Sequence, residues 1–225
     1  MDYPRFRAVA EHGLLVEFAE AISDPAHRAV LRLDRAIAAH PFDGFVEAVP
    51  AYVNILVRFD PLLTDHPAVE AALRGMLSDE DAATPEGVLR EVLVCYDADL
   101  GGDLPEVARL CDMTPEAVIA AHLAGEYRVY LYGFVPGYAY LAGVPEALRL
   151  PRKPVARRGV AAGSVIVAGP QCIVTTLIMP TGWWVLGRSP TRILTGDPAR
   201  PFLFDVGDRV RFRRIARDAF ERADG

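Results

Sequence analysis

A run of 29 residues without a charged side chain, from Gly159 to Gly187, constrains the fold of this chain more than any other feature. The run is longer than the ~20 apolar residues that a membrane span needs. Glycine and proline interrupt it so often, however, that its longest stretch free of both is Gln171–Met179. A helix broken this often would leave backbone groups unpaired in lipid. The pattern therefore predicts short buried strands and turns, and no membrane span.

A change in composition divides the chain into two parts. Its 225 residues are 52% hydrophobic and 24% charged, which excludes a multi-span membrane protein and a disordered chain. Residues 1–86 hold 7 arginines and 15 acidic residues, a net charge of −8, whereas residues 87–225 have a net charge of +2. The acidic segment Ser78–Gly87, which contains Pro85, lies at the change. We therefore predict two domains, 1–86 and 87–225.

The chain start and the cysteines predict a cytoplasmic protein. Asp2, Arg5 and Arg7 lie near the N-terminus with no apolar run behind them, so no signal peptide is expected. The three cysteines are widely spaced and form no C-x-x-C pair. This spacing favours reduced, buried thiols over a disulfide framework or a zinc site.

The first part predicts a small sheet with helices on one face. A helix is expected after the N-cap Ser23, with Pro25 in its first turn, because apolar residues recur at helical spacing until Pro41. A second helix is predicted over Pro67–Met76. The predicted strands are Arg5–Ala10, Leu14–Phe18, Phe45–Val49 and Tyr52–Phe59.

The second part predicts two short helices and a β-barrel, so that the whole chain is α+β. The helices cover Leu104–Cys111 and a segment from the N-cap Thr114 to about Gly125. Elsewhere, short β-branched or aromatic segments alternate with glycine and proline, which indicates a closed or nearly closed barrel. The predicted strands are Val92–Tyr96, Tyr127–Tyr132, Ser164–Ala168, Cys172–Ile178, Trp183–Leu186, Arg192–Leu194 and Arg209–Arg214.

Several common catalytic signatures are missing from the sequence. It contains no phosphate-binding loop, no dinucleotide-binding fingerprint, no H-E-x-x-H and no G-x-S-x-G. The five histidines are too scattered to predict a metal cluster. If this protein takes part in catalysis, any nucleotide or metal is therefore expected to come from another chain.

Arginine is concentrated in the second part. Residues 145–217 hold 12 arginines and Lys153 against four acidic residues. The arginines of Arg209–Arg214 alternate with apolar residues, as on the solvent face of a strand. Those of Arg149–Arg158 lie in a proline-containing loop, which fits a small anionic substrate, an acidic partner surface or a solvated loop. The negative net charge and the lack of a recognised basic-aromatic module argue against nucleic acid.

Two other features leave alternatives open. His122 lies on a predicted helix, where a packed, hydrogen-bonded histidine is more common than a general base. The turn Gly133–Tyr138 presents Phe134 and Tyr138, and fits either a pocket wall or a barrel corner.

Four sequence blocks in order carry a family resemblance. They are GFVPGYAYL from 133, LPRKPVARRGVAAGSV from 150, PTGWWVLGRSP from 180 and VGDRVRF from 206. Together they resemble the family of the 5-oxoprolinase B subunit, also called allophanate hydrolase subunit 1, and earlier blocks extend the resemblance to essentially the whole chain. That family includes a sporulation-kinase inhibitor, and a related module occurs in the carboxyltransferase part of biotin-dependent urea carboxylase.

The resemblance implies a small α/β domain followed by a cyclophilin-like β-barrel. It also implies a partner similar to the 5-oxoprolinase C subunit, or allophanate hydrolase subunit 2, in a complex that opens 5-oxo-L-proline, a small anionic amide, to L-glutamate. A third protein would handle ATP, and no cofactor or metal is expected in this chain. A regulatory inhibitor of a sensor histidine kinase is the alternative, and prolyl isomerase activity rests on the barrel alone.

The resemblance also implies site residues. Arg152, Arg157 or Arg188 is expected to hold the substrate carboxylate, with Trp183 and Tyr138 as pocket walls. The other matching positions in these blocks are Phe134, Pro136, Gly137, Gly163, Ser164 and Gly182.

His122 or Asp103, which also match the family, is expected to assist proton transfer. The chain departs from the family pattern close to these blocks, which leaves the exact substrate open. The departures are Ala156, Ala161, Thr175, Thr176 and Thr181.

Overall fold

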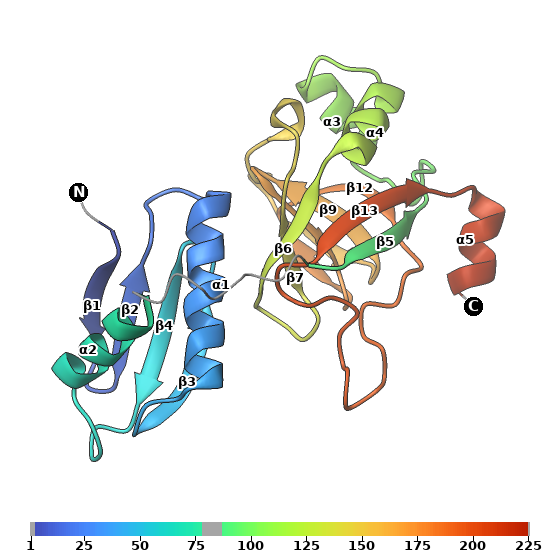
Figure 1. Cartoon of the computed structure of the whole chain (residues 1–225). Coiled ribbons are helices and arrows are strands. Elements are labelled where there is room, and N and C mark those ends of the chain that lie inside the picture. Colours follow the sequence, from blue (N-terminus) through green and yellow to red (C-terminus); the bar gives the residue numbers. More distant parts are fainter. Residues whose placement is uncertain (1–2, 78–86, 225) are drawn as a thin grey trace. The chain divides into compact units, whose positions relative to one another are not determined.

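The computed structural model describes residues 3–77 and 87–224, which belong to two compact units (Figure 1). The units are Met1–Glu86 and Gly87–Gly225. The predicted boundary segment Ser78–Gly87 lies outside the described residues, apart from Gly87. Among the described residues, no helix is long and apolar enough to cross a membrane.

The N-terminal unit is a four-stranded antiparallel sheet with two helices on one face. The strand order is β1-β2-β4-β3. The strands are β1 Arg5–Val9, β2 Gly13–Glu17, β3 Phe45–Pro50 and β4 Asn54–Phe59, and the helices are α1 Asp24–Ala39 and α2 His66–Leu77.

The sequence of α1 explains both its start and its buried face. The Ser23 hydroxyl accepts a hydrogen bond from the Ala26 amide at 3.4 Å and so caps the first turn. Val30, Leu33 and Ile37 then recur at helical spacing and are buried. They pack in one apolar cluster with alternate residues of β2 and β4, which therefore share one face of the sheet.

The C-terminal unit is a seven-stranded sheet that curls into a barrel. Its order is β12-β9-β10-β7-β6-β13-β5, and an isolated bridge between Cys95 and Arg188 joins its two ends. The amide of each of these residues donates to the carbonyl of the other at 2.9 Å. We call this junction the barrel seam. The strands are β5 Leu89–Val94, β6 Tyr127–Tyr132, β7 Ala139–Ala142, β9 Ser164–Ala168, β10 Gln171–Val174, β12 Trp184–Arg188 and β13 Arg209–Arg214.

Short elements surround this barrel. Helices α3 and α4 lie together beside the sheet in Figure 1 and contribute apolar side chains to its interior. The Thr114 hydroxyl caps α4 by accepting a hydrogen bond from the Ala117 amide at 3.1 Å. The elements are α3 Leu104–Leu110, α4 Pro115–Ala124, the short helix η1 Glu146–Leu148, the ribbon of β8 Arg157–Val160 with β11 Met179–Thr181, and α5 Arg217–Asp224.

The uncharged run supplies the core on both faces of the sheet. In β9, Val165 and Val167 pack in the barrel interior, whereas Ile166 and Ala168 pack in a second apolar cluster on the opposite face. All five residues of β9 are buried. Strands that are buried on both faces are apolar throughout, which explains why the run carries no charge. The run thus forms short buried strands and turns, as predicted, although the bounds of its strands differ in part.

The predicted α+β class with a barrel is confirmed, but some element predictions are wrong. The strand predicted to run to Ile178 ends at Val174, and the segment predicted as Arg192–Leu194 makes only an isolated bridge at Leu194. β5 covers Leu89–Val94, earlier than predicted. The strand ends were mispredicted because residue composition does not say where a strand loses its neighbour. The sequence analysis also did not predict β7, β8, β11 and α5.

Candidate functional site

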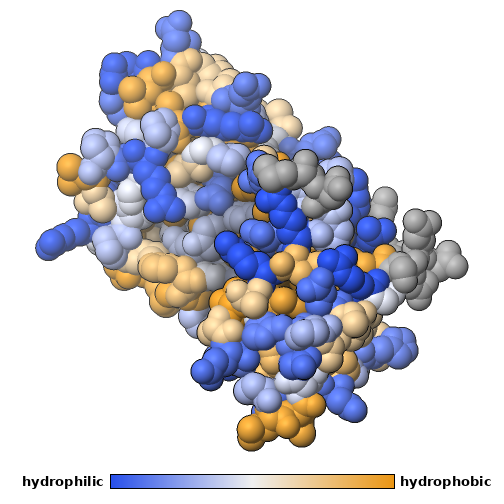
Figure 2. All heavy atoms as spheres, turned by 90° about the vertical axis from the view of Figure 1, so that its left-hand side faces the viewer, coloured by the Kyte–Doolittle hydropathy of each residue, from blue (hydrophilic) through white to orange (hydrophobic). Residues whose placement is uncertain are grey.

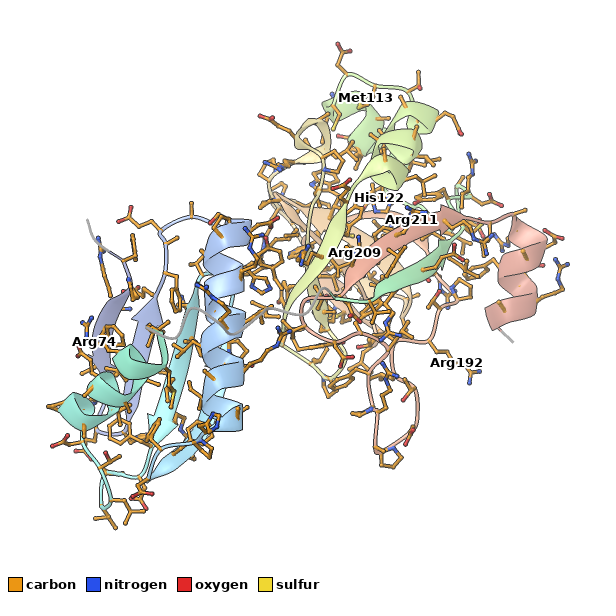
Figure 3. All side chains as sticks on the ribbon, in the orientation of Figure 1. Arg74, Met113, His122, Arg192, Arg209 and Arg211 are labelled. Carbon is orange, nitrogen blue, oxygen red and sulfur yellow. The ribbon has the colours of Figure 1, made fainter. Side chains whose placement is uncertain are left out.

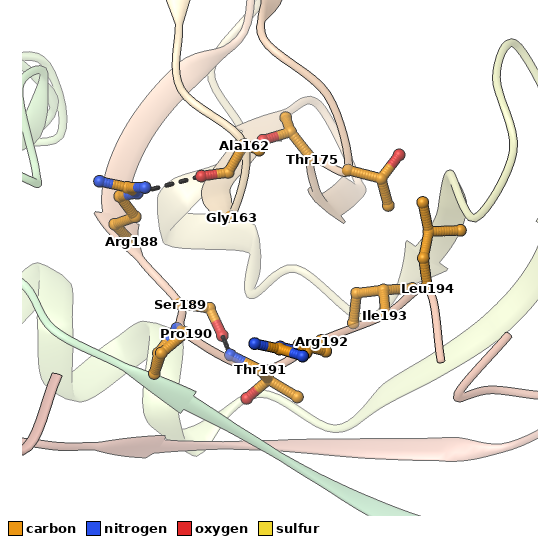
Figure 4. Close-up of a pocket in the computed structure, with 11 residues that line it drawn as sticks. Ala162, Gly163, Thr175, Arg188, Ser189, Pro190, Thr191, Arg192, Ile193 and Leu194 are labelled. Carbon is orange, nitrogen blue, oxygen red and sulfur yellow. Dashed lines mark hydrogen bonds between the residues drawn. The ribbon is translucent and has the colours of Figure 1, made fainter. Parts of the chain in front are cut away.

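A cavity of about 210 Å³ lies beside the barrel seam (Figure 4). It is bounded by the turn before β9, by the chain after β10 and by the end of β12 with the chain that follows it. Its wall is mixed, because two arginines and several hydroxyl groups lie beside apolar side chains. We call it the Arg188 pocket; its lining residues are Ala162, Gly163, Thr175, Thr176, Arg188, Ser189, Pro190, Thr191, Arg192, Ile193 and Leu194.

Gly163 shapes one wall of this pocket. Its φ is +80°, and a Cβ added there would lie 2.3 Å from the Ser189 carbonyl oxygen. The Gly163 amide donates to the Thr175 carbonyl at 2.7 Å, and its own carbonyl accepts from the Ser189 amide at 2.8 Å. Only glycine combines this left-handed backbone with so close an approach.

Ser164 and Thr175 hold the same turn from behind. The Thr175 hydroxyl accepts from the Ser164 amide at 2.9 Å and donates to the Ala161 carbonyl at 2.9 Å. The Ser164 hydroxyl donates to that carbonyl at 2.8 Å. Both side chains are buried. Ser164, expected from the family resemblance to contact substrate, therefore supports the wall of the pocket.

The Gly133–Tyr138 turn borders the pocket indirectly. The Thr176 hydroxyl donates to the Pro136 carbonyl at 2.9 Å. Gly137 has a φ of +74°, and a Cβ on it would lie 2.6 Å from the Leu194 side chain. Pro136 and Gly137 thus lie behind Thr176 and Leu194, two lining residues.

Arg188 lies at the edge of the pocket, at the barrel seam. Its Nε donates to the Ala162 carbonyl at 3.0 Å, the dashed line at the left of Figure 4. The ring of Phe220 from α5 covers its guanidinium, with the ring centroid 5.5 Å from the guanidinium carbon. The hydroxyl of Thr191 accepts from the Leu93 amide at 3.0 Å and so ties the pocket to β5.

A second group of charged residues surrounds Asp103. One carboxylate oxygen accepts from the Lys153 ammonium at 2.6 Å and from the Val185 amide at 2.8 Å. The other oxygen lies 3.8 Å from the Arg157 guanidinium. The side chains of Asp103 and Lys153 are only 15% and 11% exposed. We call Asp103, Lys153 and Arg157 the Asp103 cluster.

These contacts give Asp103 an anchoring role. Its amide also donates to the Val185 carbonyl at 3.1 Å, which fixes the start of α3 to β12. A Cβ on Gly102 would lie 2.4 Å from the Arg157 guanidinium, so that side chain packs closely over the α3 start. The Gly182 carbonyl accepts from the Lys153 amide at 2.6 Å. Gly182 therefore belongs with this cluster.

Four aromatic rings form a row on the outer face of the sheet. The ring centroids of Phe134 and Tyr138 are 5.6 Å apart, those of Tyr138 and Tyr140 5.9 Å, and those of Tyr140 and Trp183 6.1 Å. The Arg152 guanidinium lies over Trp183 at 5.6 Å. Tyr138 and Trp183 are each 5% exposed, and burial raises the pKa of Tyr138 to about 12. They fill the second apolar cluster and do not line the Arg188 pocket.

His122 is closed off inside the barrel. Figure 3 shows it between α4 and the sheet, and its side chain is 0% exposed. Its Nδ1 lies 2.8 Å from the Tyr96 hydroxyl, and its ring centroid lies 4.5 Å from that of Phe212. Burial lowers the pKa of His122 to about 3, so the imidazole is neutral. The structure therefore does not bring this predicted proton-transfer residue to the pocket.

The N-terminal unit has a cavity of a different kind, about 360 Å³ in volume. Its lining is largely apolar, and the Arg74 guanidinium, labelled in Figure 3, covers the Phe6 ring at 4.2 Å. The face drawn in Figure 2 shows apolar groups scattered among hydrophilic ones. Among the described residues of the chain, no group of three His, Cys, Asp or Glu side chains is placed to hold a metal ion.

The structure thus separates residues that the sequence analysis put in one site. Gly163 and Arg188 line the pocket, whereas Arg152, Arg157 and Trp183 do not. Sequence reasoning missed Arg192 as a lining residue. It also treated Thr175 and Thr176 only as departures from the family pattern, and placed both inside the predicted strand Cys172–Ile178, whereas β10 ends at Val174.

Comparison with known proteins identifies the family. The family described as "Carboxyltransferase domain, subdomain C and D" matches residues 4–204. The chain belongs to this family. Within it, the chain is 31% identical to the 5-oxoprolinase B subunit of Bacillus subtilis (strain 168), over 92% of this chain and 91% of that protein. It is 34% identical to the 5-oxoprolinase B subunit of Escherichia coli O157:H7, over 94% of this chain and 96% of that protein. The predicted family resemblance is confirmed.

Solved structures place this carboxyltransferase fold in longer chains. The crystal structure of TTHA0988 is 39% identical with a TM-score of 0.79, over 92% of this chain and 40% of that one. The chain therefore spans about 40% of the length of that protein. Urea carboxylase from Kluyveromyces lactis shares the fold, with a TM-score of 0.74 at 18% identity, over 96% of this chain and 22% of that one.

Proposed function

We propose that this chain is a subunit of a 5-oxoprolinase-type complex, which uses ATP to open 5-oxo-L-proline to L-glutamate and works only with its partner subunits. The two relatives that match it over nearly their whole length are both named as the B subunit of 5-oxoprolinase. That name supports an assembly with other chains. The proposal includes a cytoplasmic location.

In the proposed complex, the Arg188 pocket holds the carboxylate of the substrate. A guanidinium donates two parallel hydrogen bonds to a carboxylate, and Arg192 adds a second positive charge to the same wall. The volume of about 210 Å³ is below the roughly 300–1,000 Å³ of pockets for drug-sized ligands. A five-membered lactam with one carboxylate matches both properties. The observation that carries the proposal is an arginine at the edge of a small cavity that has a second arginine in its wall.

The proposal gives this chain a binding role and gives the bond-breaking chemistry to the assembled complex. His122 is sealed in the barrel, and the Asp103 carboxylate is engaged by Lys153 and Val185. Neither is therefore proposed to transfer a proton. The sequence has no phosphate-binding loop, so ATP is assigned to a third chain.

The proposed partner is a second protein similar to the 5-oxoprolinase C subunit. The TTHA0988 chain supports this, because more than half of its length lies beyond the region that this chain covers. A fold found within a longer chain in one protein can be supplied by a separate subunit in another.

Reconstitution tests the proposal. ADP release that depends on 5-oxo-L-proline is measured for the chain alone, for the partner chains alone and for the full set. Only the full set is expected to turn over, and Arg188→Ala is expected to reduce that turnover. Arg209→Ala is the matched control, because Arg209 is an exposed arginine on β13.

Two results would count against the proposal. A full set without 5-oxo-L-proline turnover would overturn the substrate. Partner chains that turn over equally well without this chain would overturn its role as a subunit.

A further inference from the structure

The C-terminal helix α5 has one large apolar residue in contact with the rest of the unit. Phe220 is 4% exposed and is the only buried residue of α5 among those whose burial is described. It nevertheless belongs to none of the three apolar clusters of the described chain. Its ring lies instead against the Arg188 guanidinium, 5.5 Å from centroid to guanidinium carbon. This buried ring therefore has a contact with a charged side chain at the barrel seam.

The fold brings α5 to this arginine from the barrel seam. β13 runs parallel to β5, and the Ile215 amide, just after β13, donates to the Val94 carbonyl at 2.9 Å. The next residue along the chain from β5, Cys95, forms the seam with Arg188. The helix that follows β13 therefore begins close to the end of β12. Figure 1 shows α5 beyond the ends of β13 and β5.

An ion pair holds the start of α5. One Arg217 guanidinium nitrogen donates to both Asp99 carboxylate oxygens at 2.7 Å. This hydrogen bonding lowers the pKa of Asp99, so the carboxylate stays charged. Arg217 Nε also donates to Glu221, one turn later, at 2.8 Å. The start of the helix is thus fixed to the loop after β5. Phe220, three residues after Arg217 in the same helix, contacts Arg188.

Two of the contacts of Arg188 restrict the orientation of its guanidinium. Its Nε donates in the plane of the group to the Ala162 carbonyl at 3.0 Å, and the Phe220 ring lies against it. A cation within about 6 Å of a ring centroid is attracted by the ring quadrupole. Together these contacts restrict the rotation of a long, flexible side chain at the pocket edge.

We propose that Phe220 is a positioning residue, which holds the Arg188 guanidinium for a carboxylate ligand, and that α5 is the element that delivers it. The identity of the ligand rests on the proposed function, whereas the effect on Arg188 does not. Because Phe220 does not line the pocket, it acts only through Arg188.

Three variants of the full chain separate the ring from its bulk. Phe220→Leu keeps an apolar side chain and loses the aromatic face, and Phe220→Tyr keeps that face. Arg222→Ala changes an exposed residue of the same helix and is the control. The first readout is the Arg188 Nε–H resonance in an ¹⁵N NMR spectrum, assigned with Arg188→Lys. We expect Phe220→Leu to shift it and raise its exchange with water several-fold, and the other two variants to leave it near wild type.

The second readout is the KM of the reconstituted complex for 5-oxo-L-proline. A contact worth about 0.5–2 kcal/mol corresponds to a rise of about twofold to thirtyfold in Phe220→Leu, with kcat nearly unchanged. In an Arg188→Ala background, Phe220→Leu is expected to add nothing, because the two side chains act as one unit.

The outcomes separate this inference from the proposed function. An Arg188 resonance unaffected by Phe220→Leu, or equal KM effects with and without Arg188, would overturn the positioning role. A changed resonance in a chain whose complex does not turn over 5-oxo-L-proline would support that role and overturn the proposed substrate. If Phe220→Leu does not fold, Phe220→Met decides, because it also keeps an apolar side chain without the aromatic face. An unchanged Arg188 resonance in that variant would overturn the positioning role.

Discussion

The Arg188 pocket and the Asp103 cluster are both basic, and the sequence analysis joined them in one site. In the Asp103 cluster, a carboxylate of the same chain accepts from Lys153 and lies beside Arg157. In the pocket, Arg188 and Arg192 border a cavity. The comparison teaches that a concentration of arginine does not identify a binding site. What matters is whether an arginine also borders a cavity, as Arg188 and Arg192 do.

The largest effect on stability is expected from Gly163→Ala, which adds a methyl group to the wall of the pocket. The new Cβ would need a left-handed backbone and would lie 2.3 Å from the Ser189 carbonyl oxygen. We expect a loss of about 4 kcal/mol in the free energy of unfolding. Urea denaturation measures it. Gly169→Ala is the control, because Gly169 also has a positive φ but no atom within 4 Å of an added Cβ. Equal losses would show that the close approach does not matter.

The Asp103 cluster is tested by Asp103→Ala. Loss of this acceptor leaves Lys153 nearly buried without its carboxylate, which we expect to lower the free energy of unfolding by about 3 kcal/mol. The double variant Asp103→Ala with Lys153→Met is expected to regain part of it. Glu91→Ala, in an exposed pair with Arg213, is the control and should change little. Reduced turnover in a fully stable Asp103→Ala protein would argue for a chemical role.

The comparison itself is tested by changing one arginine in each region. In the reconstituted complex, Arg188→Ala is expected to lower kcat/KM about 10- to 100-fold, because a charge-assisted hydrogen bond to the ligand is lost. Arg157→Ala is expected to leave kcat/KM within about twofold of wild type, because Arg157 lies beside a carboxylate of its own chain and loses no bond to the ligand. Steady-state kinetics against 5-oxo-L-proline measures both. The reverse ranking would move the ligand to the Asp103 cluster.

His122 belongs to neither region, and its effect depends on pH. Its pKa is about 3 in the folded chain and about 6.5 in the unfolded chain, which therefore binds more protons between these values. Stability is thus fully present above pH 6.5 and falls as the pH drops toward 3, by at most ~1.4 kcal/mol per pH unit. Urea denaturation at several pH values should show this slope weakened in His122→Gln. An unchanged slope would assign it to other groups.

The smallest effect is expected for Arg152→Ala. Arg152 is exposed, and its contact with Trp183 is a surface cation–π contact worth about 0.5–1 kcal/mol. We expect a stability loss of that size, measured by urea denaturation, with kcat/KM unchanged. A larger loss in kcat/KM than in stability would bring the aromatic row into ligand binding.

Local sequence signals predicted much of the fold. Ser23 and Thr114 cap their helices as expected, because each cap requires only a hydroxyl and a nearby amide. The strand Ser164–Ala168 also matches its prediction. The site was harder to predict. Gly163 and Arg188 were expected from the family resemblance, and so were Arg152 and Arg157, which do not line the Arg188 pocket. Sequence proximity does not determine which face of a sheet a side chain occupies.

The sequence alone determined that the uncharged run forms buried strands. Burial on both faces excludes charge, and frequent glycine and proline exclude a long helix. Only the tertiary structure decided that Arg188 meets the pocket and Phe220. That meeting depends on the pairing of β5 with β13 and on the bridge from Cys95 to Arg188, between residues far apart in the chain. Local patterns specify which elements form, whereas strand pairing specifies which side chains become neighbours.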